Sequence, residues 1–91
     1  MKEILLFGAE TCGPCQMVKK RIYAILEANE FDFEFKEIDV YDEKNENLLD
    51  KYRILNLPTL IGLTDKGEHR WEKINPNEIL RIFAEFDNTT E

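Results

Sequence analysis

A run of four apolar residues, Ile4 to Phe7, restricts the fold more than any other feature of the chain. A strand without polar positions is typical of the middle of a sheet that is covered on both faces. The chain has 91 residues, which is enough for one hydrophobic core and too few for two. We therefore predict a single α/β domain over residues 1–91, with this strand at the centre of its sheet.

The other elements are predicted from the spacing of apolar residues and from turn signals. Apolar residues recur at helical spacing in the 14–26 segment, and phenylalanines alternate with charged residues in the 31–40 segment. Asn75 and Pro76 are typical of a helix start, and we expect the polar residues 87–91 to fray. In chain order the prediction is a strand (4–7), a helix (14–26), a strand within 31–40, a short helix (48–52), two strands (59–63 and 69–74) and a helix (76–86).

This order, βαβαββα, restricts how the strands pair. A right-handed helical crossover joins parallel neighbours, whereas the turn residues 64–67 predict an antiparallel hairpin between the last two strands. The expected result is a four-stranded mixed sheet flanked by helices. Functional sites in such sheets form beyond the carboxyl ends of the parallel strands, and Cys12 follows the carboxyl end of the first strand.

Cys12 and Cys15 are the only cysteines, and they lie where the first strand gives way to a helix. Unpaired backbone N–H groups and the positive end of the helix dipole stabilise a thiolate there, so Cys12 is the candidate nucleophile. Cys15 is close enough to attack a mixed disulfide formed by Cys12, which makes it the candidate resolving thiol. A permanent bridge would close a very short loop and add little stability. The pair therefore predicts thiol–disulfide exchange.

Composition argues against several other functions. A net charge of −7 with scattered basic residues is unfavourable for binding nucleic acid, and no apolar run approaches the roughly 20 residues of a membrane span. No export signal precedes the first strand, so we expect a cytoplasmic protein. The Cys-x-x-Cys spacing is also half of a zinc or iron–sulfur site. The only histidine, His69, lies far along the chain, however, and we predict no metal.

Two segments together carry a resemblance to a known family. Cys12-Gly13-Pro14-Cys15 follows a predicted strand, and Tyr52-Arg53-Ile54-Leu55-Asn56-Leu57-Pro58-Thr59 precedes another. This combination resembles thioredoxin over nearly the whole chain. The resemblance implies the thioredoxin fold, catalysis by Cys12 and Cys15, and a cis Leu57–Pro58 peptide bond facing them. The residues that it implies in substrate binding are Thr11, Gly13, Pro14, Leu57, Pro58 and Thr59.

The same resemblance implies a protein-disulfide reductase that needs no organic cofactor. Its expected partners are disulfide-containing substrate proteins and a thioredoxin-reductase-like flavoprotein that supplies electrons, and we expect a monomer. The nearest alternative is a glutaredoxin-like redoxin or an electron donor to ribonucleotide reductase, since the short first segment and Thr11-Cys12 also resemble those proteins. The features with which glutaredoxins hold glutathione are absent from the sequence. A redox-inert binding module is a further alternative, and the two intact cysteines argue against it.

Two positions depart from the thioredoxin pattern. Thr11 stands where thioredoxins usually carry a tryptophan, and Leu6 stands where they place a buried aspartate that helps to move the proton of the resolving thiol. Glu10, Glu34 and Glu37 are candidate substitutes, although in so acidic a chain the simpler interpretation is that they are surface carboxylates. Without a buried negative charge nearby, we expect the nucleophilic cysteine to ionise below the ordinary thiol pKa of about 8.5.

Overall fold

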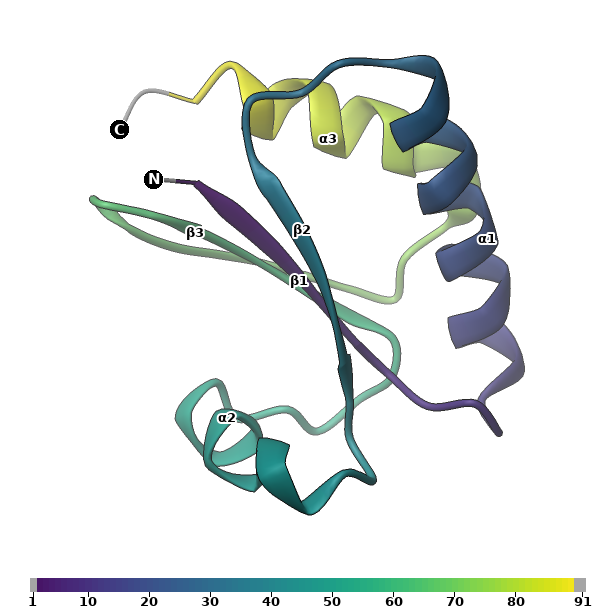
Figure 1. The fold of residues 1–91 in the computed structure, drawn as a ribbon, viewed down its shortest axis with the longest axis vertical. Coiled ribbons are helices and arrows are strands. Elements are labelled where there is room, and N and C mark those ends of the chain that lie inside the picture. Colours follow the sequence, from purple (N-terminus) through teal and green to yellow (C-terminus); the bar gives the residue numbers. More distant parts are fainter. Residues whose placement is uncertain (1, 90–91) are drawn as a thin grey trace.

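The computed structural model describes residues 2–89 and centres on a four-stranded sheet (Figure 1). The elements are β1 (Glu3–Gly8), α1 (Gly13–Ala28), β2 (Glu34–Asp39), the 3₁₀ turn η1 (Glu43–Asn45), α2 (Glu46–Lys51), β3 (Thr59–Thr64), β4 (Gly67–Glu72), the 3₁₀ turn η2 (Pro76–Glu78) and α3 (Ile79–Asp87). The strands lie in the order β2-β1-β3-β4, and only β1 and β2 are parallel. The predicted element order and mixed sheet are confirmed.

The central position of β1 explains its uniformly apolar sequence. Figure 1 shows α1 and α3 on one face of the sheet and α2 on the other. Ile4 and Leu6 pack into the core under α1 and α3, whereas Leu5 and Phe7 pack into the core on the α2 side. None of these four side chains is more than 5% exposed. A polar residue at any of these positions would lose its contact with water.

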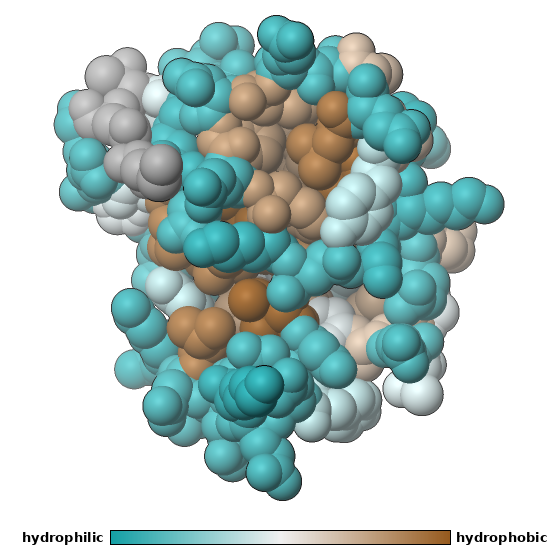
Figure 2. All heavy atoms as spheres, viewed as in Figure 1, coloured by the Kyte–Doolittle hydropathy of each residue, from teal (hydrophilic) through white to brown (hydrophobic). Residues whose placement is uncertain are grey.

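β2 is shorter than the segment that the phenylalanine alternation marked. Phe31 and Phe33 precede it; their rings stack with centroids 5.3 Å apart, and both meet the Phe83 ring edge-on. The alternation therefore reflects packing against α3 at these two positions and strand pairing only from Glu34 onward. Apolar side chains reach the surface over this end of β2 (Figure 2).

β4 begins and ends two residues earlier than predicted. Thr64 pairs with Gly67 across the hairpin, so only two residues form the turn. Gly67 has a φ of 141°, which glycine adopts without steric cost. At the other end, Lys73 has a φ of 51°, which interrupts the extended backbone immediately after Glu72.

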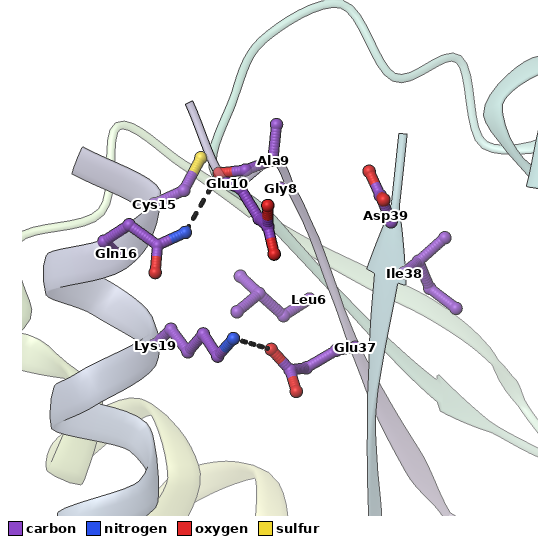
Figure 3. A pocket seen from close by; sticks show the side chains of 10 residues that line it. All are labelled: Leu6, Gly8, Ala9, Glu10, Cys15, Gln16, Lys19, Glu37, Ile38 and Asp39. Carbon is purple, nitrogen blue, oxygen red and sulfur yellow. Dashed lines mark hydrogen bonds and ion pairs between the residues drawn. The ribbon is translucent and has the colours of Figure 1, made fainter. Parts of the chain in front are cut away.

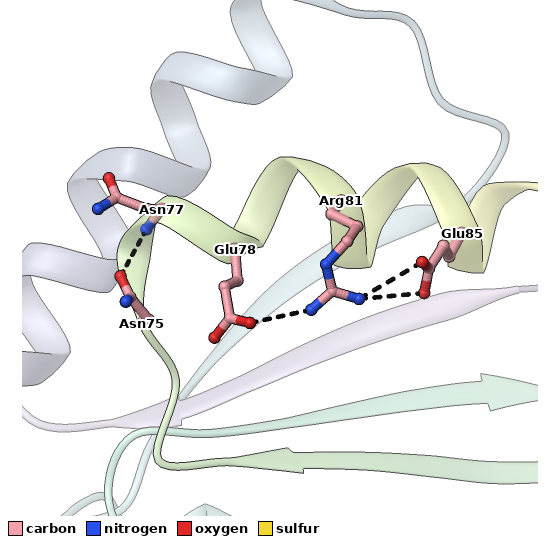
Figure 4. A network of polar contacts seen from close by, with 5 residues as sticks. All are labelled: Asn75, Asn77, Glu78, Arg81 and Glu85. Carbon is pink, nitrogen blue, oxygen red and sulfur yellow. Dashed lines mark hydrogen bonds and ion pairs between the residues drawn. The ribbon is translucent and has the colours of Figure 1, made fainter.

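The last helix begins with the 3₁₀ turn η2, and α3 follows from Ile79 (Figure 4). The Asn75 side-chain oxygen accepts a hydrogen bond from the backbone N of Asn77 at 2.9 Å, which confirms Asn75 as a cap. The backbone N of Glu78 donates to the carbonyl of Asn75, three residues back, as in a 3₁₀ turn. The Glu78 carboxylate pairs with Arg81 at 3.1 Å, and Arg81 also pairs with Glu85 at 3.4 Å.

Lys2 ties the first strand to the carboxyl end of α3. Its side chain is buried, and Nζ donates to the backbone oxygens of Phe86 at 3.2 Å, Asp87 at 2.5 Å and Thr89 at 3.2 Å. A cation at this end of a helix satisfies carbonyls that lack intrahelical partners. Asp87 and Thr89 are thus held in the fold, and residues 90–91 of the predicted tail lie outside the described residues.

Gly62→Ala is expected to destabilise the fold by about 1–3 kcal/mol through overpacking. A β-carbon at Gly62 would lie 2.6 Å from Cε1 of Phe86 and 3.0 Å from Cη2 of Trp71. Those two rings pack edge to face with centroids 5.9 Å apart, so neither can move without disturbing the other. Urea unfolding measures the effect. Gly13→Ala is the control, because nothing lies within 4 Å of a β-carbon there, and equal stability of the two variants would contradict the prediction.

Candidate functional site

A disulfide bond joins Cys12 and Cys15 at the amino-terminal end of α1. Cys12 is the N-cap residue, and its Sγ accepts a hydrogen bond from the backbone N of Cys15 at 3.2 Å. The helix therefore offers the Cys12 sulfur the donor that would stabilise a thiolate. Cys15 is 2% exposed, whereas Cys12 is half-buried. Of the two cysteines, Cys12 is thus the more accessible from solvent.

Gly8, the last residue of β1, allows Cys15 to pack directly against the sheet. A β-carbon on Gly8 would lie 3.2 Å from Cβ and 3.3 Å from Sγ of Cys15. Any larger residue would have to push Cys15 away from the strand. The spacing of apolar residues marks Gly8 only as a strand end, so this contact could not be found from periodicity.

The second predicted segment lies next to the end of β1. The Leu57–Pro58 peptide bond is cis, which is the geometry that the resemblance implies. Thr59, which follows Pro58, pairs with Phe7 in the β1–β3 ladder, and Gly8, which follows Phe7, packs against Cys15. Pro58 and Thr59 are buried and Leu57 is half-buried. The remaining predicted contact residues are exposed around Cys12, and they are Thr11, Gly13 and Pro14.

A pocket of about 230 Å³ opens behind Cys15, between α1, β1 and β2 (Figure 3). Leu6 lines it, at the position where the resemblance implies a buried acid. Of the three candidate carboxylates, Glu10 and Glu37 also line the pocket. Glu34 does not, and its carboxylate lies 3.9 Å from the Lys36 ammonium. The pocket that lacks an acid on β1 therefore has carboxylates from neighbouring segments.

Glu37 is held in this pocket by two side chains of α1. It pairs with Leu6 in the parallel ladder, Lys19 Nζ lies 3.0 Å from its Oε1, and the Tyr23 hydroxyl donates to its Oε2 at 2.5 Å. Partial burial raises the pKa of Glu37, but the hydrogen bonds from Tyr23 and Lys19 outweigh it and lower the pKa overall. The bond to Glu37 is also the main cause that raises the pKa of Tyr23 to about 12. At neutral pH Glu37 is therefore ionised.

Side chains of β4 contact the segment that leads to Pro58. The Arg70 guanidinium donates to the backbone oxygens of Tyr52 and Arg53, and Glu72 accepts a hydrogen bond from the Asn56 side chain at 2.8 Å. Arg70 and Glu72 are two positions apart in a strand and so share a face, a pattern visible in the sequence. What that face contacts depends on strand register, which the pattern does not provide.

The His69 and Trp71 side chains pack against other aromatic rings. Their rings stack with centroids 6.0 Å apart, and both meet the Phe86 ring edge-on. Within residues 2–89, no group of three or more His, Cys, Asp and Glu side chains is arranged to hold a metal ion. None of the helices in that range combines the length and apolar character needed to cross a membrane.

A family model for thioredoxin matches residues 2–86. The chain belongs to the thioredoxin family. Among curated proteins, this thioredoxin-family chain is 32% identical over 67 residues to protein disulfide isomerase-like 1-2 from Oryza sativa subsp. japonica. The matched region is 70% of the chain but only 13% of that relative's length.

Solved thioredoxin structures share the fold. Thioredoxin O2 from Arabidopsis thaliana superposes with a TM-score of 0.80 at 16% identity, over 93% of this chain and 74% of that chain. The Fasciola hepatica thioredoxin gives 0.78 at 24% identity, over 93% and 80% of the two chains. These matches confirm the predicted thioredoxin fold. Family membership and the Cys12–Cys15 disulfide together support thiol–disulfide oxidoreductase chemistry in general.

Proposed function

We propose that the chain is a protein-disulfide reductase that cycles between a Cys12/Cys15 dithiol and the disulfide seen in the structure. The observation that carries this proposal is the unequal exposure of the two sulfurs. Cys12 caps the helix and is half-buried, whereas Cys15 is 2% exposed behind it. One cysteine is thus accessible to an intermolecular disulfide, and the other is protected until that disulfide has formed.

The reaction proceeds in two exchanges. The Cys12 thiolate attacks one sulfur of the substrate disulfide, which forms a Cys12–substrate disulfide and expels the other substrate sulfur as a thiolate. Cys15 then loses its proton and attacks Cys12 Sγ, which closes the Cys12–Cys15 bond and expels the second substrate sulfur. The substrate gains two electrons and two protons, and the dithiol loses them. No organic cofactor takes part in these steps.

The exposed residues around Cys12 and the cis-proline segment form the proposed substrate contacts. Thr11, Gly13 and Pro14 surround the accessible sulfur, and Gly13 and Pro14 form the start of α1 that presents it. Leu57, Pro58 and Thr59 begin or precede β3, and this segment would contact an extended substrate chain through backbone hydrogen bonds of the half-buried Leu57, since Pro58 and Thr59 are buried. These backbone contacts would hold the scissile disulfide in line with Cys12.

The proposed partners follow from the same chemistry. A reductase that ends each cycle as a disulfide needs a two-electron donor, and we assign this role to a thioredoxin-reductase-like flavoprotein. Its substrates would be proteins with accessible disulfides. The proposal places the chain in the cytoplasm as a monomer, where a reducing environment favours electron flow toward the substrate.

A side-by-side assay tests the function and its electron donor. Reduction of insulin is followed with NADPH and thioredoxin reductase, and in parallel with NADPH, glutathione and glutathione reductase. We expect turnover with the first system. Turnover only with the second would assign the chain to the glutaredoxin-like alternative, and failure to reduce insulin even with dithiothreitol as donor would favour a redox-inert binding module.

A further inference from the structure

The segment between α2 and β3 is anchored by side chains that come from β4. Arg70 Nη1 donates to the backbone oxygen of Arg53 at 3.4 Å, and Nη2 donates to the backbone oxygen of Tyr52. The fork of a guanidinium can reach two acceptors at once in a fixed geometry, which an ammonium cannot do in the same way. One side chain of the sheet edge thus holds two consecutive carbonyls of the connection.

Those two carbonyls lie where α2 ends, in a backbone conformation that needs support. Arg53 has a φ of 50°, a left-handed conformation that favours glycine. The backbone N of Arg53 donates to the Asp50 oxygen at 3.3 Å and that of Ile54 to the Leu49 oxygen at 3.0 Å, the hydrogen-bond pattern of a helix terminated by a left-handed residue. The backbone oxygens of Tyr52 and Arg53 take no part in this pattern, and both accept hydrogen bonds from Arg70.

A second anchor lies three residues further along the segment. The Asn56 side chain donates to Glu72 Oε1 at 2.8 Å, and the Glu72 carboxylate lies 3.7 Å from the Arg70 guanidinium. The Thr59 hydroxyl donates to the backbone oxygen of Asn56 at 2.6 Å. Glu72 also pairs with Thr59 in the β3–β4 ladder. Arg70 and Glu72 therefore hold the segment at two points, Tyr52–Arg53 and Asn56, before it reaches Leu57 and Pro58.

We propose that Arg70 and Glu72 are positioning residues, which hold the segment before Pro58 in the place where it binds the protein substrate. They fix the backbone of Tyr52 to Asn56, which in turn sets where Leu57 and Pro58 lie relative to Cys12. This inference rests on the proposed function, in which Leu57 to Thr59 bind the substrate chain. Neither side chain takes part in the sulfur chemistry, so a small disulfide that contacts only Cys12 does not depend on them.

The test compares a protein disulfide with a small one. Arg70→Ala is expected to raise the KM for insulin about fivefold, because that factor corresponds to the net free energy of roughly one hydrogen bond. The kcat should change less than about twofold. The rate with 5,5′-dithiobis(2-nitrobenzoic acid) should stay within about twofold of the wild-type rate. Arg70→Lys should restore the insulin KM only in part, because it lacks the guanidinium fork.

Arg81→Ala is the matched control, since Arg81 is an exposed arginine of α3 that pairs with Glu78 and Glu85 (Figure 4), and α3 lies on the face of the sheet opposite α2 (Figure 1). If Arg70→Ala does not fold, Glu72→Ala and Asn56→Ala test the second anchor with the same two substrates. An unchanged insulin KM, equal loss with both substrates, or the same loss in Arg81→Ala would overturn the inference. If the wild-type chain itself does not reduce insulin, the proposed function fails, which is a different result.

Discussion

Cys12→Ser is expected to abolish reduction of insulin disulfides, and Cys15→Ser is expected to accumulate a mixed disulfide with the substrate. Cys12 is the accessible sulfur at the helix cap, so without it no intermolecular bond can form. Cys15 is buried and is the disulfide partner of Cys12. Without Cys15 the intermolecular bond forms but is not resolved. Activity should fall at least about a hundredfold in both variants.

Non-reducing electrophoresis and mass spectrometry of each variant after incubation with a disulfide substrate distinguish the two roles. The chain has no other cysteine, so each variant has a single thiol and any covalent adduct identifies the sulfur that formed it. The double variant is the control for non-covalent association. Recovery of adducts from Cys12→Ser, with none from Cys15→Ser, would reverse the assignment of nucleophile and resolving thiol.

Leu6→Asp is expected to lower the free energy of unfolding by about 3–5 kcal/mol at pH 8, where the introduced carboxyl group is ionised in the unfolded chain. Leu6 is 3% exposed, belongs to the core under α1 and α3, and borders the pocket behind Cys15. The substitution removes an apolar side chain and brings a charge close to Glu37, its partner in the ladder, which is ionised at neutral pH. Both effects oppose folding.

Leu6→Asn separates the cost of charge from the cost of truncation. Burial and the nearby carboxylate raise the folded-state pKa of the introduced carboxyl group above its unfolded value of about 3.9. A raised folded pKa means that the contribution of this carboxyl group to stability is largest at low pH and is lost as the pH rises through the folded pKa. Urea unfolding should therefore give similar stabilities for the two variants near pH 4 and a lower stability for Leu6→Asp at pH 8. Equal stability at both pH values would show that the pocket accommodates a charge at this position.

The element types could be predicted because their signals are local. The apolar run from Ile4 to Phe7 marked a buried strand, and Cys12 and Pro14 marked the start of α1. The errors lie at boundaries where a non-local contact competes with periodicity. Phe31 and Phe33 alternate like strand residues, yet their partner is Phe83 of α3.

Some residues of the site could likewise be predicted from the sequence, and others could not. The sequence pointed to both cysteines and to the Leu57–Thr59 segment, the latter through resemblance and not through periodicity. It offered Glu10, Glu34 and Glu37 as equivalent acids, and the tertiary structure distinguishes them, because Glu37 lines the pocket behind Cys15 whereas Glu34 does not. Arg70 and Glu72 were not identified at all, since they lie on β4 and their contacts are with the segment between α2 and β3, which comes much earlier in the chain.

The sequence by itself determined which segments become strands and helices and that two thiols stand at the start of a helix, because these properties depend on neighbours within a few residues. The tertiary structure decided which distant segments meet. The register of β1 with β2 and with β3 brings Glu37 level with Leu6 and Thr59 level with Phe7. Register is set by the combined packing of both sheet faces, so no single stretch of sequence contains it.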